Sequence, residues 1–89
     1  MNTNDLLTKA LKASGEPTRL RILALLRQGD LSVGELVEIL DQSQPRLSHH
    51  LKTLTQAGLV ERLPEGSWVY YRTARRGPNL QLLNTIFDS

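Results

Sequence analysis

The stretch SVGELVEILDQSQPRLSHHLK, from Ser32 to Lys52, has the pattern of two short helices joined by a tight turn. Ser32 and Glu35 begin the first helix as an S-x-x-E capping box, in which each side chain accepts a hydrogen bond from the other residue's backbone amide. We expect this helix to stop at Asp41 and Gln42. The apolar residues within it predict one buried stripe made of Leu36, Val37, Ile39 and Leu40.

The second helix has its own start and stop signals. Ser43 is the N-cap, and Pro45 stands in the first turn, where a missing amide proton breaks no helical hydrogen bond. The helix is expected to end near Ala57, because Gly58 readily takes the left-handed conformation that follows many helices. Three leucines at i, i+4 and i+7 place one side of this helix against the core: Leu47, Leu51 and Leu54.

The opposite side of the second helix carries side chains that form hydrogen bonds: Gln44, Arg46, Ser48, His49, Lys52, Thr53 and Gln56. Those nearest the N-terminus have a length suited to base edges in a major groove, where Gln pairs with adenine and Arg with guanine. A solvated polar face on any amphipathic helix has the same pattern, so the helix alone leaves both interpretations open. Residues 32–57 form the predicted helix-turn-helix, and the segment that follows favours DNA as its partner.

A β-hairpin is predicted directly after the helix-turn-helix, over residues 59–72. Leu59–Leu63 is a short extended run, Pro64–Ser67 has turn chemistry, and Trp68–Arg72 is rich in strand formers. In one interpretation the hairpin only covers the core with Trp68 and the tyrosines. A hairpin at this place is also a wing, whose polar side chains are expected to meet the DNA backbone or minor groove: Arg62, Arg72 and the neutral donor Ser67. Both interpretations hold together, because alternate residues face opposite sides.

The positive charge is concentrated in the same part of the chain. The net charge of the 89 residues is +2. Residues 42–76 hold six Lys or Arg against two acids, hence +4, whereas residues 1–41 and 77–89 each carry −1. A basic segment that coincides with the helix and the wing is what contact with phosphates requires.

The length and composition indicate one small domain, residues 1–89, which dimerisation would help to stabilise. The chain contains no Cys, which excludes a disulfide framework and a thiolate metal site and fits a reducing compartment. Its start lacks the cationic and apolar regions of a signal peptide, and no stretch is long enough to span a membrane. We therefore expect a cytoplasmic protein without membrane contact.

Helices are predicted on both sides of the motif. Residues 4–14 form a first helix that Gly15 ends, and a second helix begins at Pro17 and stops at Gly29. After a break at Arg75–Pro78, a closing helix carries Leu80, Leu82, Leu83, Ile86 and Phe87. The expected order is α-α-α-α-β-β-α, a mainly α fold with a small β-hairpin, which is a winged helix-turn-helix.

Five blocks of the sequence resemble, in order and spacing, the ArsR/SmtB family of bacterial winged-helix repressors: 16–23 (EPTRLRIL), 31–36 (LSVGEL), 43–52 (SQPRLSHHLK), 57–60 (AGLV) and 66–72 (GSWVYYR). The match covers roughly residues 10–73, which makes it far more specific than any single motif. The resemblance implies a homodimeric repressor that binds double-stranded DNA at an inverted-repeat operator and leaves it when a signal binds.

The resemblance also implies roles for individual residues. Gln44, Ser48 and His49 match the family's DNA-contacting places, and Arg46 is a further candidate at the variable site between them. In the family the first and last helices make the dimer. The implied interface therefore lies in residues 1–14 and 78–89, at Leu6, Leu7, Ala10, Leu11, Leu83, Ile86 and Phe87.

The metal ligands of many family members are missing from this chain. Ser32 and Gly34 stand where those members have a Cys-x-Cys, and the closing segment offers Asp88 but no His. His49 and His50 are adjacent, about 100° apart around a helix, which is a poor chelating geometry. His50 is expected to face the helix flank as a structural residue. We therefore expect no metal and no cofactor, and an effector other than a Cys-bound metal.

Other functions are weighed against DNA binding. A winged helix can serve as a protein-protein interaction module, in which case Trp68, Tyr70 and Tyr71 would form an exposed aromatic patch. ArsR-like domains also precede methyltransferase domains, and residues 43–48 with 57–59 are similar to those fusions, so that the sensing part would lie beyond residue 89. An enzyme is not expected, because the sequence shows no nucleophile with a base, no phosphate-binding Gly loop and no paired carboxylates.

Overall fold

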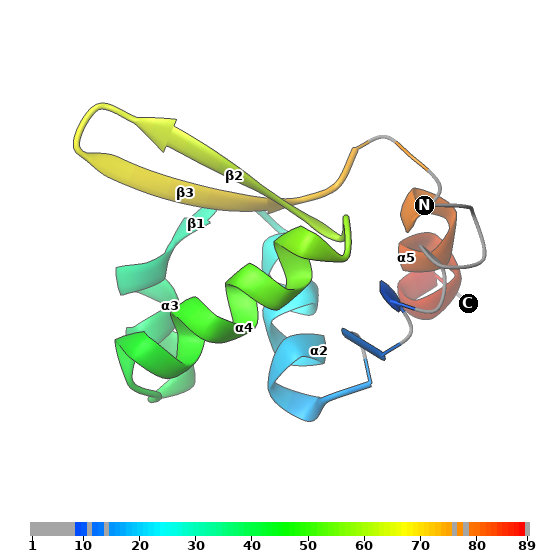
Figure 1. The fold of residues 1–89 in the computed structure, drawn as a ribbon, viewed down its shortest axis with the longest axis horizontal. Helices are drawn as coiled ribbons and strands as arrows, with labels where there is room; N and C mark the ends of the chain where they lie inside the picture. The colour runs from blue at the N-terminus through cyan, green and yellow to red at the C-terminus, as the bar shows by residue number, and fades with distance from the viewer. Residues whose placement is uncertain (1–8, 11, 14, 76, 78, 89) are drawn as a thin grey trace.

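A computed structural model describes residues 9, 10, 12, 13, 15–75, 77 and 79–88 (Figure 1). The hairpin projects beyond the helices, and the last helix lies at the other end of the molecule from the hairpin tip (Figure 1). The elements are α2 (Pro17–Leu26), β1 (Leu31–Ser32), α3 (Val33–Leu40), α4 (Gln44–Gln56), β2 (Val60–Glu65), β3 (Trp68–Thr73) and α5 (Asn79–Asp88). The mainly α fold with a small β-hairpin is thus confirmed.

Helix α3 begins with the predicted capping box. Ser32 Oγ accepts from the amide of Glu35 at 3.2 Å, and the Ser32 amide donates to Glu35 Oε1 at 3.0 Å. The helix ends at Leu40, and Asp41 follows in the left-handed region at φ 53°. The predicted buried stripe is wrong at Ile39, whose side chain is 51% exposed. Ile39 lines a surface groove between α2 and α3 instead of packing into the core.

Helix α4 follows its predicted boundaries. Its N-cap hydroxyl, on Ser43, accepts from the amide of Arg46 at 3.4 Å. The helix is capped at Ala57, and Gly58 has the predicted positive φ, at 76°. The side chain of Asn79, at the start of α5, donates to the carbonyl of Ala57 at 2.5 Å and so joins α5 to the end of α4. The leucine stripe of α4 is fully buried in the core: Leu47, Leu51 and Leu54.

The sheet contains one more strand than the sequence predicted. Strand β1 pairs antiparallel with β3, which gives the order β1-β3-β2. The predicted turn over 64–67 is too long, because both strands continue to a two-residue turn of Gly66, at φ 62°, and Ser67. Pro64 therefore lies within β2. The ladder tolerates it because β2 is an edge strand, whose outer amides need no partner strand.

The helix before the motif starts as predicted, since Pro17 is its first residue and the carboxylate of Glu16 accepts from the amide of Arg19 at 2.9 Å. It ends at Leu26, three residues earlier than the predicted stop at Gly29. Of the first helix predicted over residues 4–14, the described residues 9, 10, 12 and 13 are helical. Leu6, Leu7 and Leu11 lie outside the described residues.

One hydrophobic core joins the helices and the sheet. Ala10 and Leu83, which the family resemblance assigned to a dimer interface, are both buried in this core within the single chain. Ile86 and Phe87 are half-buried. In the part of the chain that the structure describes, no helix is both long and apolar enough to cross a membrane.

Candidate nucleic-acid interface

The predicted reading residues share the exposed face of α4, opposite its buried leucine stripe. Four of these side chains are exposed: Gln44, Arg46, Ser48 and Lys52. No hydrogen bond or ion pair joins any of the four to another described residue. His49 is exposed as well, and its backbone carbonyl accepts from the hydroxyl of Thr53 at 3.1 Å. Donors that have no partner among the described residues are available to an external one.

A groove of about 240 Å³ separates α4 from the wing. From α4 it is lined by Ser48, Lys52, Thr55 and Gln56, and from the sheet by Arg62 and Tyr71. Sequence reasoning singled out most of these residues but missed the contributions of Thr55 and Tyr71. The helical spacing of Ser48, Lys52 and Thr55 could have indicated that Thr55 lies on this side of α4. No local pattern indicates the position of Tyr71, because it depends on how the sheet packs against α4.

Arg62 and Arg72 lie on opposite faces of the wing. Arg62 pairs with Tyr71 across the ladder, whereas Arg72 pairs with Glu61, and successive side chains of a strand alternate in direction. Arg62 is exposed on the face that borders α4. Arg72 is 26% exposed, and its Nη2 atom lies 3.4 Å from Asp30 Oδ2 in the loop between α2 and β1. Its Nε atom is buried without a hydrogen-bond partner among the described residues.

The aromatic side chains of the wing are divided between two environments. Trp68, next to the turn, is 64% exposed, so it does not cover the core. Tyr70 and Tyr71 are half-buried, and Tyr71 packs against the core cluster. The three rings therefore do not form the single exposed patch that a protein-protein interaction module would need. Ser67 is exposed at the turn itself.

The two histidines of α4 differ in their surroundings. His49 faces solvent, whereas the Nδ1 atom of His50 lies 3.4 Å from Arg19 Nη1 and 3.9 Å from Glu16 Oε2. Burial lowers the pKa of His50, with Arg19 adding to this effect and Glu16 opposing it. The pKa of Glu16 is also lowered: burial opposes the shift, but the Arg19 amide and the charges of His50 and Arg19 outweigh it. The predicted position of His50 on the helix flank is confirmed.

The described residues contain no group of three or more His, Cys, Asp or Glu side chains that could hold a metal ion. The hydroxyl of Ser32, one of the two residues that the family resemblance aligned with a Cys-x-Cys, is used in the capping box of α3. Arg27 contacts the last helix: it donates to the carbonyl of Leu83 at 3.1 Å and lies 5.1 Å from the centroid of the Phe87 ring.

Comparisons with known proteins agree with this geometry. A family model described as "Bacterial regulatory protein, arsR family" matches residues 16–62. An HTH-type transcriptional regulator of Methanocaldococcus jannaschii is 46% identical over 61 residues, which are 67% of this chain and 68% of the relative. The transcriptional repressor SdpR of Bacillus subtilis is 38% identical over 65 residues, 73% of this chain and 72% of the repressor.

The solved structures include a close match to the fold. The homodimeric winged helix-turn-helix DNA-binding domain of a Mycobacterium bovis protein, described as a possible ArsR-family transcriptional regulator, superposes with a TM-score of 0.81 at 32% identity. The match covers 92% of this chain and 75% of that domain. The winged helix-turn-helix predicted from the sequence is thereby confirmed.

Proposed function

This chain belongs to the ArsR family of bacterial regulatory proteins, and from that premise we propose that it represses transcription as a homodimer on an inverted-repeat operator. The observation that carries the proposal is the exposed face of α4. Its exposed side chains at positions 44, 46, 48 and 52 have no hydrogen-bond or ion-pair partner among the described residues, while the opposite face is buried by three leucines. A helix in this arrangement fits the major groove of duplex DNA.

The N-terminal half of α4 supplies the base contacts in this proposal. Gln44, Arg46 and Ser48 stand in its first turns, where recognition helices reach base edges. His49 and Lys52 follow on the same exposed side and are placed to meet bases or phosphates. Because these side chains make no contacts that hold the fold together, their replacement should change DNA binding without unfolding the protein.

The wing supplies sequence-independent contacts. Arg62 faces the groove beside α4, and Ser67 is exposed at the hairpin turn, which supports the proposal that both approach the DNA backbone or the minor groove. Arg72 lies on the other face, where its ion pair with Asp30 joins the wing to the loop before β1. From that position its positive charge adds to the attraction of the wing for DNA. Contacts of this kind fix the position of the protein on the duplex without selecting a sequence.

The dimer in this proposal uses the last helix together with the N-terminal segment. Ile86 and Phe87 are only half covered within one chain, and the similar M. bovis domain is described as homodimeric. Residues 1–89 act as one DNA-binding domain that works in the cytoplasm without a cofactor. An effector other than a Cys-bound metal releases the operator, because neither Ser32 nor Gly34 offers a thiolate.

Selection of bound fragments from a random pool of duplex DNA tests the proposal. The expected product is an inverted repeat whose half-sites lie about one helical turn apart. Binding to it, measured by fluorescence anisotropy, should weaken steeply with salt because contacted phosphates release counterions. A folded protein that enriches no sequence and shows no salt-dependent affinity for DNA would contradict the proposal.

A protein-protein interaction module is the second candidate, and of the three wing aromatics it would have Trp68 alone as an exposed contact. Exposure in the free protein does not separate the two functions, since the tip of a DNA-binding wing is also open to solvent. Quenching of Trp68 fluorescence by acrylamide in the presence of the selected DNA does separate them. Protection of Trp68 by DNA supports the wing contact, whereas unchanged quenching together with weak DNA binding supports the module.

A further inference from the structure

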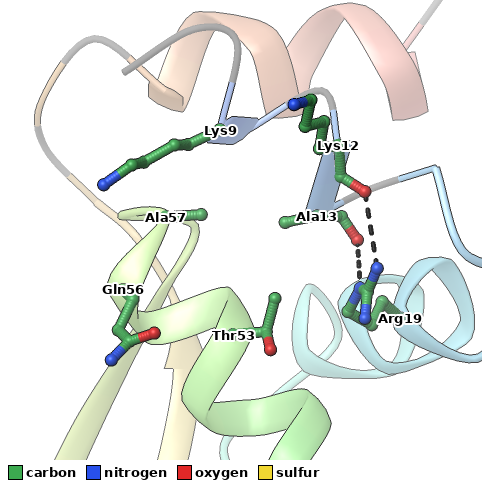
Figure 2. A pocket seen from close by; sticks show the side chains of 7 residues that line it. All are labelled: Lys9, Lys12, Ala13, Arg19, Thr53, Gln56 and Ala57. Atoms are coloured by element: carbon green, nitrogen blue, oxygen red, sulfur yellow. Dashed lines mark hydrogen bonds between the residues drawn. The ribbon is translucent and has the colours of Figure 1, made fainter. Parts of the chain in front are cut away.

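A second hollow lies on the flank of α4 that faces away from the wing groove (Figure 2). Its volume is about 250 Å³, and it is open to solvent. Cationic residues from two parts of the chain meet around it. The lining consists of Lys9, Lys12, Ala13, Arg19, Thr53, Gln56 and Ala57.

Two of the polar side chains that line this hollow, those of Arg19 and Thr53, already have partners. Arg19 Nε donates to the carbonyl of Ala13 at 2.6 Å, and Nη2 donates to that of Lys12 at 3.4 Å. The third nitrogen, Nη1, lies against His50, and the hydroxyl of Thr53 donates to a carbonyl of its own helix. The hollow therefore offers few free donors to a small molecule held within it.

The positive charges that remain available lie at the outer edge of the hollow, on two lysines. Lys9 and Lys12 are exposed, and no ion pair joins either to a described carboxylate. They are three residues apart in a helical segment, which places them on one side of it. In Figure 2 the side chain of Lys9 extends toward the end of α4 near Gln56 and Ala57, and the ammonium of Lys12 points away from Arg19. Two exposed positive charges on one side of a segment can bind successive phosphates of an extended polyanion.

Cationic side chains from other segments of the chain thus lie on both sides of α4. Gln56 lines the wing groove on one side and this hollow on the other, so it marks the ridge between them. Arg62 stands beyond the first flank, and Lys9 and Lys12 stand beyond the second. A duplex that receives α4 in its major groove presents a phosphate strand on each side of that helix.

We propose that Lys9 and Lys12 bind backbone phosphates of the operator, across α4 from the wing. This inference rests on the proposed function and adds a second row of DNA contacts to it. Arg19 acts as a positioning residue. Its two hydrogen bonds to the carbonyls of Lys12 and Ala13, and its contact with His50, fix the lysine segment to both α2 and α4.

The test compares the salt dependence of DNA binding for the wild type and a Lys9→Gln, Lys12→Gln double variant. Each lost phosphate contact should lower the slope of log K against log salt by about 0.9, hence by about 1.8 per protomer. Affinity at 0.1 M salt should fall about tenfold or more, with the preferred sequence unchanged. Arg21→Gln is the control for the loss of one surface charge away from the proposed contacts, because Arg21 is an exposed cation beside Ile39, in the groove between α2 and α3.

Three results would overturn the inference. If the wild type binds its operator and the double variant keeps the full slope, Lys9 and Lys12 make no phosphate contact, although the proposed function stands. If the wild type shows no salt-dependent DNA binding, both proposals fail together. If inorganic phosphate stabilises the DNA-free wild type saturably, and the double variant loses this effect while keeping its slope, the hollow is a small-anion site instead.

Discussion

Arg19 Nη1 lies 3.4 Å from His50 Nδ1, which joins the N-terminal part of α2 to the middle of α4. Glu16 completes the cluster, with its Oε2 atom 3.9 Å from the same nitrogen. Burial and the neighbouring guanidinium keep the pKa of His50 below its ordinary value of 6.5. The surroundings of His50 therefore disfavour its charged form relative to a histidine in the unfolded chain.

Acidification from pH 7.5 to 5 should lower the free energy of unfolding. The pKa of His50 is lower in the folded than in the unfolded state, so the unfolded chain takes up a proton first. The stabilisation is complete above about pH 6.5 and is lost as the pH falls toward the folded pKa. Glu16 stays charged in this window, because its own pKa is held below 4.5. Urea unfolding at several pH values measures the effect.

His50→Gln should flatten the pH dependence of stability. The comparison variant is His49→Gln, which replaces the exposed neighbouring histidine and keeps His50, so most of the pH dependence set by burial of His50 should remain. The charged groups that act on His50 are Glu16, Arg19, Arg46 and its neighbour His49. His50→Gln keeps all four, whereas His49→Gln removes one of the smaller contributions. An equal dependence on pH in the wild type and in His50→Gln would show that His50 does not control it.

Gly58→Ala should destabilise the protein. Gly58 has φ 76°, a conformation that costs about 1 to 2 kcal/mol in residues with a Cβ. The added Cβ would also lie 3.0 Å from Asn79 Nδ2, the atom that joins α5 to the end of α4. Thermal unfolding measures the loss. Gly29→Ala serves as the control, because φ is not positive there and nothing lies within 4 Å of the new methyl group. Equal stability of the two variants would contradict the assignment.

The elements that the sequence predicted correctly are those with local signals. Ser32 and Glu35 are three residues apart, and Gly58 directly follows the helix that it ends, so their roles are visible in short windows. Strand β1 has only two residues, and it exists because β3, almost forty residues later, offers partners to them. No pattern within two residues can indicate such a strand.

The same distinction applies to the candidate site. The exposed face of α4 follows from helical periodicity, and the structure places its predicted residues together. The difference between Arg62 and Arg72 follows from the docking of the hairpin, since the pairing of Arg72 with Asp30 joins residues far apart in the sequence. The clamp of Arg19 on Lys12 and Ala13 depends in the same way on tertiary packing.

Arg62 and Arg72 should respond differently to truncation. Arg62→Ala should weaken binding to all DNA sequences alike and lower the salt slope by about 0.9 per protomer, without a change in stability. Arg72→Ala should instead lower the free energy of unfolding by up to about 1 kcal/mol, because it removes a partly exposed ion pair. A double-mutant cycle with Asp30→Ala measures that coupling. Identical slopes and stabilities for the two arginine variants would contradict the division of roles.

Arg46→Ala tests whether α4 reads bases. Arg46 is exposed in the first turns of α4, and only its amide is engaged, with the Ser43 hydroxyl. If its guanidinium contacts a guanine, truncation should cost about 1 to 3 kcal/mol at one position of each half-site and relax the preference there. Lys52→Ala, farther along the same face, should weaken binding to preferred and altered sites by the same factor. Competition between operator variants measures both effects. An unchanged preference in Arg46→Ala would mean that Arg46 only positions the helix, and base reading would then depend on Gln44 and Ser48.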